Sequence, residues 1–298
     1  MNQESIAIIG AGPSGMAMAI QLKRYGLEPV VFEKGEPGGL LKNANLVENY
    51  PGFPGGIRGP ELVERMVTQL EDLRVNVLPE EVTSLDFRGD AFVMRTGKRR
   101  YQFQRVAVAS GTKPILASLA EYGGQAERLV SYEVYPIIKE KWKKIVIVGA
   151  GDAAFDYALN LAWQNDVIIL NRGSAVASLP LLVERAKNHP NITYYQNAAI
   201  SRIDLDEPGS RAILMCTSPA GMRRITADYL IFAIGRQPCK DYFSKAVQEC
   251  QEELVAQDRL YMIGDVKNDI YRQTAIAVGD GVLAAMRLYQ VCKEGKAR

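Results

Sequence analysis

Short apolar runs and longer helical patterns alternate along the first third of the chain. Residues 5–9 (Ser-Ile-Ala-Ile-Ile) predict a buried strand, residues 16–25 follow a helical pattern, and residues 29–32 predict a second strand, which Glu33 closes. Short apolar runs bounded by turn residues are typical of strands buried in a parallel sheet. The first strand and the helix are joined by the sequence Gly10-Ala11-Gly12-Pro13-Ser14-Gly15.

A glycine loop in this place predicts a dinucleotide-binding site. Gly10 permits the tight turn out of the strand, Gly12 lets the backbone approach a pyrophosphate, and Gly15 lets the helix pack closely on the strand. The amides at the amino end of the helix would face the phosphates, and Glu33 can accept hydrogen bonds from ribose hydroxyls. A glycine loop between strand and helix, with an acid at this distance, favours a nucleotide site over a ligand-free turn.

The same pattern occurs again near the middle of the chain. Residues 144–148 (Lys-Ile-Val-Ile-Val) predict a strand, residues 155–163 a helix and residues 166–170 another strand, after which Asn171-Arg172 follows. The intervening loop reads Gly149-Ala150-Gly151-Asp152-Ala153-Ala154, so Ala154 holds the place of the third glycine. Two such units in one chain predict two dinucleotides.

Two further apolar runs, residues 106–112 and 229–234, end in small-residue turns. We expect both strands at the edges of the second nucleotide unit, where the chain crosses between domains. A last strand, residues 261–265, precedes a helix from about Gln273 to Val291. The sequence therefore predicts an α/β protein with two Rossmann-like, three-layer domains, of which residues 114–236 are inserted between residues 1–113 and 237–298.

Composition narrows the class of partner. Apolar residues make up 47% of the chain and charged residues 23%, and the formal net charge is only +2, which argues against nucleic acid. No apolar run reaches the ~18 residues of a membrane span, and the first residues carry neither a basic flank nor a cleavage site. We therefore expect no nucleic acid and no membrane as partner, and a cytoplasmic protein.

The cysteines and the histidine exclude several kinds of site. The four cysteines form no Cys-x-x-Cys pair, and the one histidine is His189; the cysteines are Cys216, Cys239, Cys250 and Cys292. Scattered cysteines with a single histidine predict neither a disulfide framework nor a metal site.

Together these motifs resemble the low-molecular-weight thioredoxin reductase family, within the wider pyridine nucleotide–disulfide oxidoreductases. The resemblance covers essentially the whole chain, and its pieces occur in the family's order. Besides the two glycine loops they are Gly38-Gly39-Leu40, Val47-Glu48-Asn49-Tyr50-Pro51-Gly52, Ala109-Ser110-Gly111, Gly264-Asp265-Val266 and Ile270-Tyr271-Arg272-Gln273.

The resemblance implies the cofactors and their sites. FAD would bind the first domain and NADPH or NADH the inserted one, and the protein would be a homodimer. The residues expected at FAD are Gly10, Ala11, Gly12, Pro13, Ser14, Gly15, Glu33, Lys34, Gly38, Gly39, Leu40, Asn49, Val82, Ala109, Gly111, Gly264, Asp265, Arg272, Gln273 and Thr274. Those expected at NAD(P)H are Gly149, Ala150, Gly151, Asp152, Ala153, Asn171 and Arg172.

Within this resemblance, three roles are more specific. Gly264-Asp265 would hold the ribityl chain and pyrophosphate, and Asn49 with Gly38-Gly39 would line the isoalloxazine pocket. Arg272, Gln273 and Thr274 would open a helix whose amino end stabilises negative charge on the reduced flavin. At the other nucleotide, Arg172 can bind a 2′-phosphate through two parallel hydrogen bonds, which favours NADPH over NADH.

The chain departs from the family where thioredoxin reductases carry their redox Cys-Ala-Thr-Cys. The corresponding residues run from Glu133 to Pro136, and neither a carboxylate nor a proline can cycle electrons. The thioredoxin-reductase-like ferredoxin (or flavodoxin)–NADP reductases are similar, disulfide-free relatives.

We therefore expect an FAD-dependent NAD(P)H oxidoreductase that exchanges electrons with an external partner, such as ferredoxin, flavodoxin or a small molecule. No protein side chain is assigned as a catalytic acid or base. Two alternatives stay open: a reductase of a low-molecular-weight disulfide, and a nucleotide-binding regulatory protein that has lost turnover.

Overall fold

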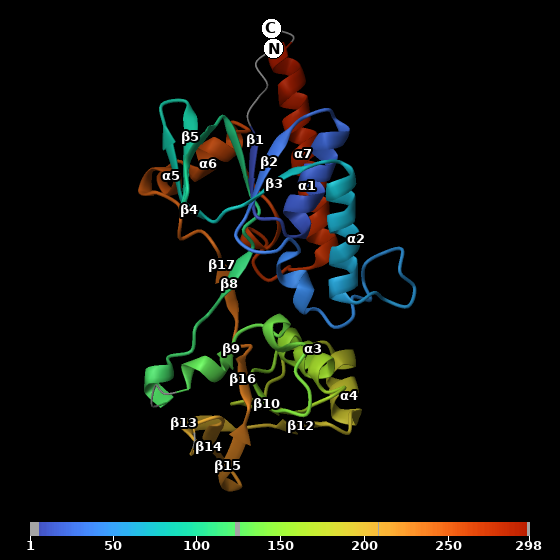
Figure 1. Cartoon of the computed structure of the whole chain (residues 1–298), viewed down its shortest axis with the longest axis vertical. Helices are drawn as coiled ribbons and strands as arrows, with labels where there is room; N and C mark the ends of the chain where they lie inside the picture. Colours follow the sequence, from blue (N-terminus) through green and yellow to red (C-terminus); the bar gives the residue numbers. More distant parts are fainter. Residues whose placement is uncertain (1–5, 123–125, 208, 297–298) are drawn as a thin grey trace. The chain divides into compact units, whose positions relative to one another are not determined.

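The computed structural model describes residues 6–122, 126–207 and 209–296; Ser5, predicted as the first strand residue, lies outside them. The chain divides into two compact units (Figure 1). Unit 1 holds residues up to Lys42, Val47–Lys113 and those from Gln237 on, and unit 2 holds Asn43–Leu46 and Pro114–Arg236. Each unit is described by itself below.

A parallel five-stranded sheet forms the middle layer of unit 1. Its order is β18-β7-β1-β2-β3. The strands are β1 (Ile6–Ile9), β2 (Pro29–Glu33), β3 (Asn76–Pro79), β7 (Arg105–Val108) and β18 (Leu260–Met262). The strand expected at residues 106–112 is thus shorter and lies inside the unit 1 sheet, between β18 and β1, and the chain enters unit 2 directly after it, at Pro114.

Three helices lie together on one side of this sheet (Figure 1). They are α1 (Pro13–Arg24), α2 (Gly59–Asp72) and α7 (Thr274–Lys296). Helices α1 and α7 pack so closely that a side chain at Gly281 would clash with Ser14 and lie 2.9 Å from Met18 N. Their far ends meet through Tyr25 and Tyr289, whose stacked rings are 4.1 Å apart.

Helix α7 is the one helix in the described part of the chain that is long and apolar enough to cross a membrane, with a mean hydropathy of 1.3. A core helix of a globular domain can have the same composition. In α7 one side, with Ala284, Ala285 and Leu288, is buried in unit 1, while Leu283 and Met286 are exposed.

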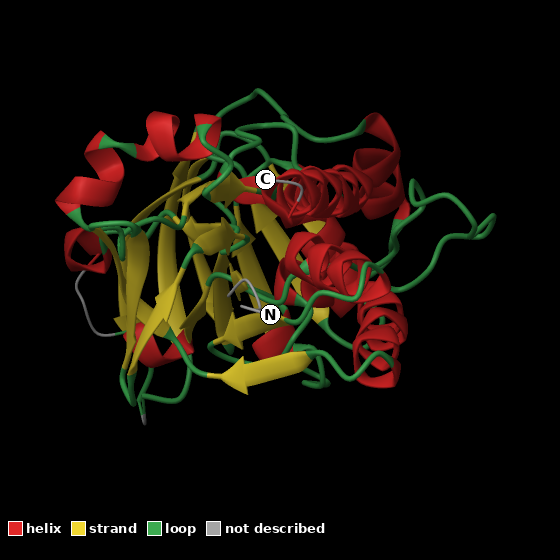
Figure 2. Ribbon diagram, turned by 90° about the horizontal axis from the view of Figure 1, so that it is seen from above, coloured by secondary structure: helices red, strands yellow, loops and turns green. Residues whose placement is uncertain are grey.

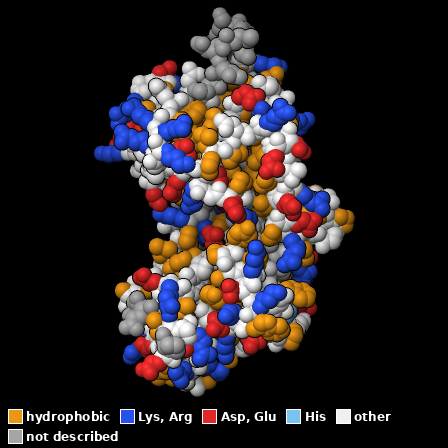
Figure 3. Space-filling view, viewed as in Figure 1, with side chains coloured by type: hydrophobic (Ala, Val, Ile, Leu, Met, Phe, Trp, Pro, Cys, Tyr) orange, Lys and Arg blue, Asp and Glu red, His pale blue; other side chains and the backbone are white. Residues whose placement is uncertain are grey.

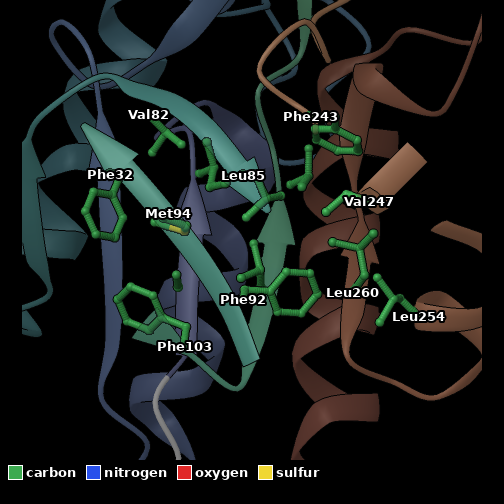
Figure 4. Packing of buried hydrophobic residues seen from close by; sticks show 14 of the residues in the cluster. Phe32, Val82, Leu85, Phe92, Met94, Phe103, Phe243, Val247, Leu254 and Leu260 are labelled. Atoms are coloured by element: carbon green, nitrogen blue, oxygen red, sulfur yellow. The ribbon is translucent and has the colours of Figure 1, made fainter. Parts of the chain in front are cut away.

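The opposite side of the unit 1 sheet is covered by an antiparallel sheet and two short helices. The strands are β4 (Val82–Arg88), β5 (Ala91–Thr96) and β6 (Arg100–Phe103), and the helices are α5 (Lys245–Glu249) and α6 (Gln251–Ala256). Figure 4 shows the core that these layers enclose, in which Phe32, Phe92, Phe103, Phe243 and Leu260 are buried. This core fixes the sheet from which the predicted cofactor loops emerge.

Unit 2 repeats the three-layer arrangement. Its parallel sheet has the order β12-β11-β10-β16-β9, with β9 (Val130–Ser131), β10 (Lys144–Val148), β11 (Asp166–Leu170), β12 (Ile192–Tyr195) and β16 (Tyr229–Phe232). One hydrophobic core joins this sheet to α3 (Asp152–Leu161) and α4 (Pro180–Asn188). A second core joins it to the antiparallel strands β13 (Ala199–Leu205), β14 (Ala212–Ser218) and β15 (Gly221–Ala227).

The predicted α/β class with two Rossmann-like domains is confirmed, and Figure 2 shows the strands and their flanking helices by colour. The strand expected at residues 229–234 is β16, which lies between β10 and β9 in the unit 2 sheet, and the chain returns to unit 1 shortly after it, at Gln237. Where the chain passes between units, β8 (Thr112–Pro114) pairs with β17 (Arg236–Pro238). On the face shown in Figure 3, acidic and basic side chains are interspersed.

Candidate functional site

The predicted cofactor loops of unit 1 all follow strands of one parallel sheet. The Gly10–Gly15 loop follows β1, Glu33 ends β2, Ala109 and Gly111 follow β7, and Gly264 follows β18. Because these strands are parallel, the loops meet at the carboxyl edge of the sheet, where open α/β sheets bind ligands. The structure therefore brings together motifs that lie more than half the chain apart.

Three glycines of the first loop differ in what surrounds them. A Cβ at Gly10 would lie 2.5 Å from Ala109 O, and one at Gly15 would clash with Gly10 O, so both glycines serve the protein's own packing. A Cβ at Gly12 would meet only Gly39 Cα, at 4.0 Å. The space beside Gly12 is thus open, as a site for a pyrophosphate against bare backbone requires.

Hydrogen bonds tie the neighbouring motifs to this loop. Glu33 accepts the N–H of Ala11 through Oε2 (2.8 Å) and that of Gly35 through Oε1 (3.0 Å). Gly38 donates its N–H to Ala11 O at 2.8 Å, and a Cβ at Gly39 would lie 3.2 Å from Gly12 Cα. Glu33 therefore also orders the loop, in addition to its expected contact with a ribose.

Two predicted flavin residues far apart in sequence meet directly. Asn49 donates through Nδ2 to Oε1 of Gln273, 2.8 Å away, next to the first residue of α7, Thr274. Lys34 is exposed, and Leu40, Asp265 and Arg272 are half-buried. Val82 differs from its expected role because its side chain is buried in the hydrophobic core, so only its backbone is left to contact a cofactor.

Sequence reasoning missed Asp280, which shapes the Gly264 turn. Its Oδ2 accepts the N–H of Gly264 at 3.0 Å and Nδ2 of Asn268 at 2.6 Å, and its Oδ1 pairs with Lys267 Nζ at 3.0 Å. Asp280 lies within α7, so no local motif links it to the turn. It positions the Gly-Asp motif from the neighbouring helix.

The second glycine loop repeats the first in unit 2. A Cβ at Gly149 would clash with Ala233 O, whereas one at Gly151 would make only an ordinary contact, 3.7 Å from Ala177 O. Ala154, in the place of the third glycine, lies in the first turn of α3 and is fully buried. Ala150 lies in the turn, Ala153 lies in the first turn of α3, and Asp152 accepts the N–H of Leu179 at 2.8 Å.

Asn171 and Arg172 follow β11 but differ in exposure. Asn171 is buried: its Nδ2 donates to Ala175 O and Tyr194 Oη, both at 2.9 Å, and its Oδ1 accepts the N–H of Gly173 at 3.1 Å. Asn171 therefore shapes its own loop, while Arg172 is exposed and available to a ligand.

Glu133 and Pro136, the residues expected to stand in place of a redox cysteine pair, lie in unit 2. Glu133 forms an ion pair with Arg236 (3.3 Å) and accepts from Asn43 Nδ2 (3.4 Å), and Pro136 lies in a short 3-10 helix, Tyr135–Ile137. Of the four cysteines, Cys216 and Cys292 are buried, and Cys239 and Cys250 are half-buried. No cysteine stands at Glu133 or Pro136 to form a disulfide there.

Asp156 has a perturbed carboxyl group. Burial raises its pKa to about 6, with a smaller contribution from Asp152, against the hydrogen bonds from the N–H groups of Asn45 and Leu46. Burial likewise raises the pKa of neighbouring Tyr157 to about 12. Neither residue stands out in the sequence, because each lies within an ordinary helical pattern and belongs to no motif.

Two Rossmann-like sheets, each with a glycine loop at its carboxyl edge, are the arrangement of a protein that binds two dinucleotides. The pyridine nucleotide-disulphide oxidoreductase family matches residues 4–281, and the chain belongs to that family. Its relatives include a thioredoxin reductase of Streptomyces clavuligerus, 30% identical over 95% of this chain and 92% of the relative, and one of Chlamydia trachomatis, 28% identical over 96% and 97%.

A solved structure agrees over the same length. Thioredoxin reductase from Lactococcus lactis superposes with a TM-score of 0.82 at 25% identity and covers 98% of this chain and 99% of its own. The chain is thus a flavoprotein oxidoreductase of the thioredoxin reductase type, and this family uses FAD and NADPH. The open space at Gly12 and the exposed Arg172 fit these cofactors.

Proposed function

We propose that the protein is an FAD-dependent NADPH oxidoreductase that passes electrons from its flavin directly to an external acceptor. The proposal is supported by the residues Glu133 and Pro136, which stand where the resemblance to thioredoxin reductases expects the redox cysteines. Neither Glu133 nor Pro136 can form a disulfide, and Glu133 is instead bonded to Arg236 and Asn43, so we expect the reduced flavin to pass electrons to no dithiol of these two residues. The relatives are named thioredoxin reductases. We propose that this chain differs from them in using no disulfide of its own for electron transfer.

Unit 1 would be the FAD domain and unit 2 the NADPH domain. The Gly10–Gly15 loop with Glu33 and Gly264 would hold FAD, and the Gly149–Ala154 loop with Arg172 would hold NADPH. When bound, the two cofactors supply hydride transfer between nicotinamide and flavin, so the protein's own contribution is position and electrostatics. The amino end of α7, next to Gln273, would favour negative charge on a reduced flavin.

The acceptor would be a small redox protein such as ferredoxin or flavodoxin. A dye, a small quinone or a low-molecular-weight disulfide are the competing acceptors. The proposal also includes a homodimer, which is typical of the family. Exposed apolar side chains on α7, from Ile276 to Met286, support a second copy on that helix.

Anaerobic reduction of the purified holoenzyme tests the function. NADPH should bleach the flavin, and ferredoxin or flavodoxin should reoxidise it, whereas thioredoxin should not. The matched control is Cys239→Ser, which should leave all rates unchanged because Cys239 is a single half-buried thiol. Reduction of thioredoxin at rates normal for a thioredoxin reductase would overturn the proposal, and so would a failure of NADPH to reduce the flavin.

A further inference from the structure

The loop after β11, residues 171–173, offers only one positively charged side chain to a ligand. Arg172 is this charged residue, and it is exposed. Asn171 is buried and hydrogen-bonded within its own loop, so its side chain is not available to a ligand. This loop is fastened to the segment after β12: Asn171 N–H donates to Tyr195 O (2.9 Å), Asn197 N–H to Gly173 O (3.0 Å) and Ala198 N–H to Asn171 O (2.8 Å). A group held by Tyr195 is therefore next to the loop of Arg172.

Arg223 is held on Tyr195. Its Nη1 donates to Tyr195 Oη at 2.8 Å, and its guanidinium carbon lies 4.3 Å from the centroid of the tyrosine ring. In the antiparallel sheet, Arg223 of β15 lies opposite Cys216 of β14, and Cys216 lies opposite Ile200, near the start of β13. Tyr195 thus contacts both the guanidinium of Arg223 on β15, through its side chain, and the loop at the carboxyl end of β11, through its backbone.

The alternation along β15 shows which way Arg223 points. Ile225 and Ala227 are buried against the parallel sheet, and Arg223 shares their face of the strand, whereas Arg224 lies on the opposite face. In the described part of the chain neither Arg172 nor Arg223 forms an ion pair with a carboxylate. Two unneutralised guanidinium groups, one of them oriented by an aromatic ring, are suited to a phosphomonoester.

We propose that Arg223, oriented by Tyr195, joins Arg172 in a site for the 2′-phosphate of NADPH. The proposal rests on the proposed role of unit 2 as the NADPH domain. Each guanidinium would donate charge-assisted hydrogen bonds to the phosphate oxygens. The Tyr195 hydroxyl accepts from Arg223, so its own proton is available to the phosphate. Stacking on the ring also limits the rotamers that Arg223 would lose on binding.

Calorimetric titration with 2′,5′-ADP and with 5′-AMP isolates the contribution of the 2′-phosphate without turnover. We expect Arg223→Ala to weaken 2′,5′-ADP by about tenfold or more, as loss of a charge-assisted bond implies, with 5′-AMP unchanged. Arg172→Ala should act in the same way. Tyr195→Phe, which keeps the ring, should weaken 2′,5′-ADP to a smaller extent, and Arg223→Lys should keep part of the affinity.

Arg224→Ala is the matched control, since it removes an equal charge from the other face of the same strand. It should leave both affinities unchanged, and unfolding midpoints should show that all variants are folded. An unchanged ratio of 2′,5′-ADP to 5′-AMP affinity in Arg223→Ala would overturn the assignment of Arg223 alone. Failure of the wild type to bind either nucleotide would overturn both this inference and the nucleotide role of unit 2.

Discussion

At the scale of single residues, substitutions at different glycines of the first loop should affect either cofactor binding or folding. We expect Gly12→Val to purify with less than about a tenth of the normal flavin content, because the side chain would fill the pyrophosphate position. Its apoprotein should unfold within about 0.5 kcal/mol of the wild-type apoprotein, since only Gly39 Cα lies near. Absorbance ratios and urea unfolding measure both quantities.

The contrasting variant is Gly10→Ala. Its Cβ would lie 2.5 Å from Ala109 O at a φ of +105°, so the apoprotein itself should lose stability. Full flavin content in Gly12→Val would remove the assignment of the loop to FAD.

Asp156 makes stability depend on pH. Its pKa in the folded protein is about 6, above the ordinary 3.8, so the neutral form is favoured on folding. The free energy of unfolding should therefore be highest below about pH 4 for this group and decrease as pH rises through 6, by at most about 3 kcal/mol. Urea unfolding between pH 4 and 8 measures the change.

The informative variant is Asp156→Asn, which keeps an oxygen to accept the N–H of Asn45 but carries no charge. We expect it to flatten this part of the pH profile, so that it gains stability over wild type at pH 8. Asp166→Asn, an exposed acid of the same unit, is the control and should leave the profile as it is. Identical profiles for Asp156→Asn and wild type would contradict the account.

At the scale of elements, the contact of α1 with α7 depends on one glycine. A methyl group at Gly281 would clash with Ser14 O, and Ser14 is itself a predicted FAD residue. We expect Gly281→Ala to cost roughly 1–3 kcal/mol of unfolding free energy, as overpacking does. Gly97→Ala is the control: Gly97 has nothing within 4 Å of a Cβ, so its stability should hardly change. Equal effects of the two variants in urea unfolding would refute the packing argument.

The elements that the sequence predicted best are those whose signals come from residues close together in the chain. The strands and helices around both glycine loops were predicted because short apolar runs, glycines and acids lie close together in sequence. The helices were placed too late, at residues 16 and 155, although α1 begins at Pro13 and α3 at Asp152. The phosphate-facing turn is already helical, and a proline fits the first helical position.

What the sequence did not predict depends on distant contacts. The antiparallel strands β13–β15 carry no motif, so the sequence gives no reason to assign Arg223 to a site. Its contact with the ring of Tyr195 is visible only in the structure. Asp280 is a helix residue whose partner, the N–H of Gly264, lies on another element. Asn171 was expected at the nucleotide, but burial directs its side chain into its own loop.

At the scale of the whole molecule, the exposed face of α7 should form a homodimer interface. Ile276, Leu283 and Met286 are 40%, 48% and 48% exposed, and their spacing places them on one side of the helix. We expect sedimentation equilibrium to give twice the mass of the chain, and Leu283→Glu with Met286→Glu to give a monomer. Leu181→Glu, equally exposed but in unit 2, should stay dimeric. A monomeric wild type would exclude the interface.

The insertion of unit 2 has a consequence for synthesis on the ribosome. Unit 1 cannot complete its sheet or cover α1 until β18 and α7, from beyond Gln237, have emerged. Unit 2 lies almost wholly within one continuous stretch, so its domain can fold while the first 113 residues still lack their partners. In chains truncated after Lys245 and released from the ribosome, protease should spare unit 2 and cut unit 1. The new chain would thus fold unit 2, the proposed NADPH domain, before unit 1 can take up flavin.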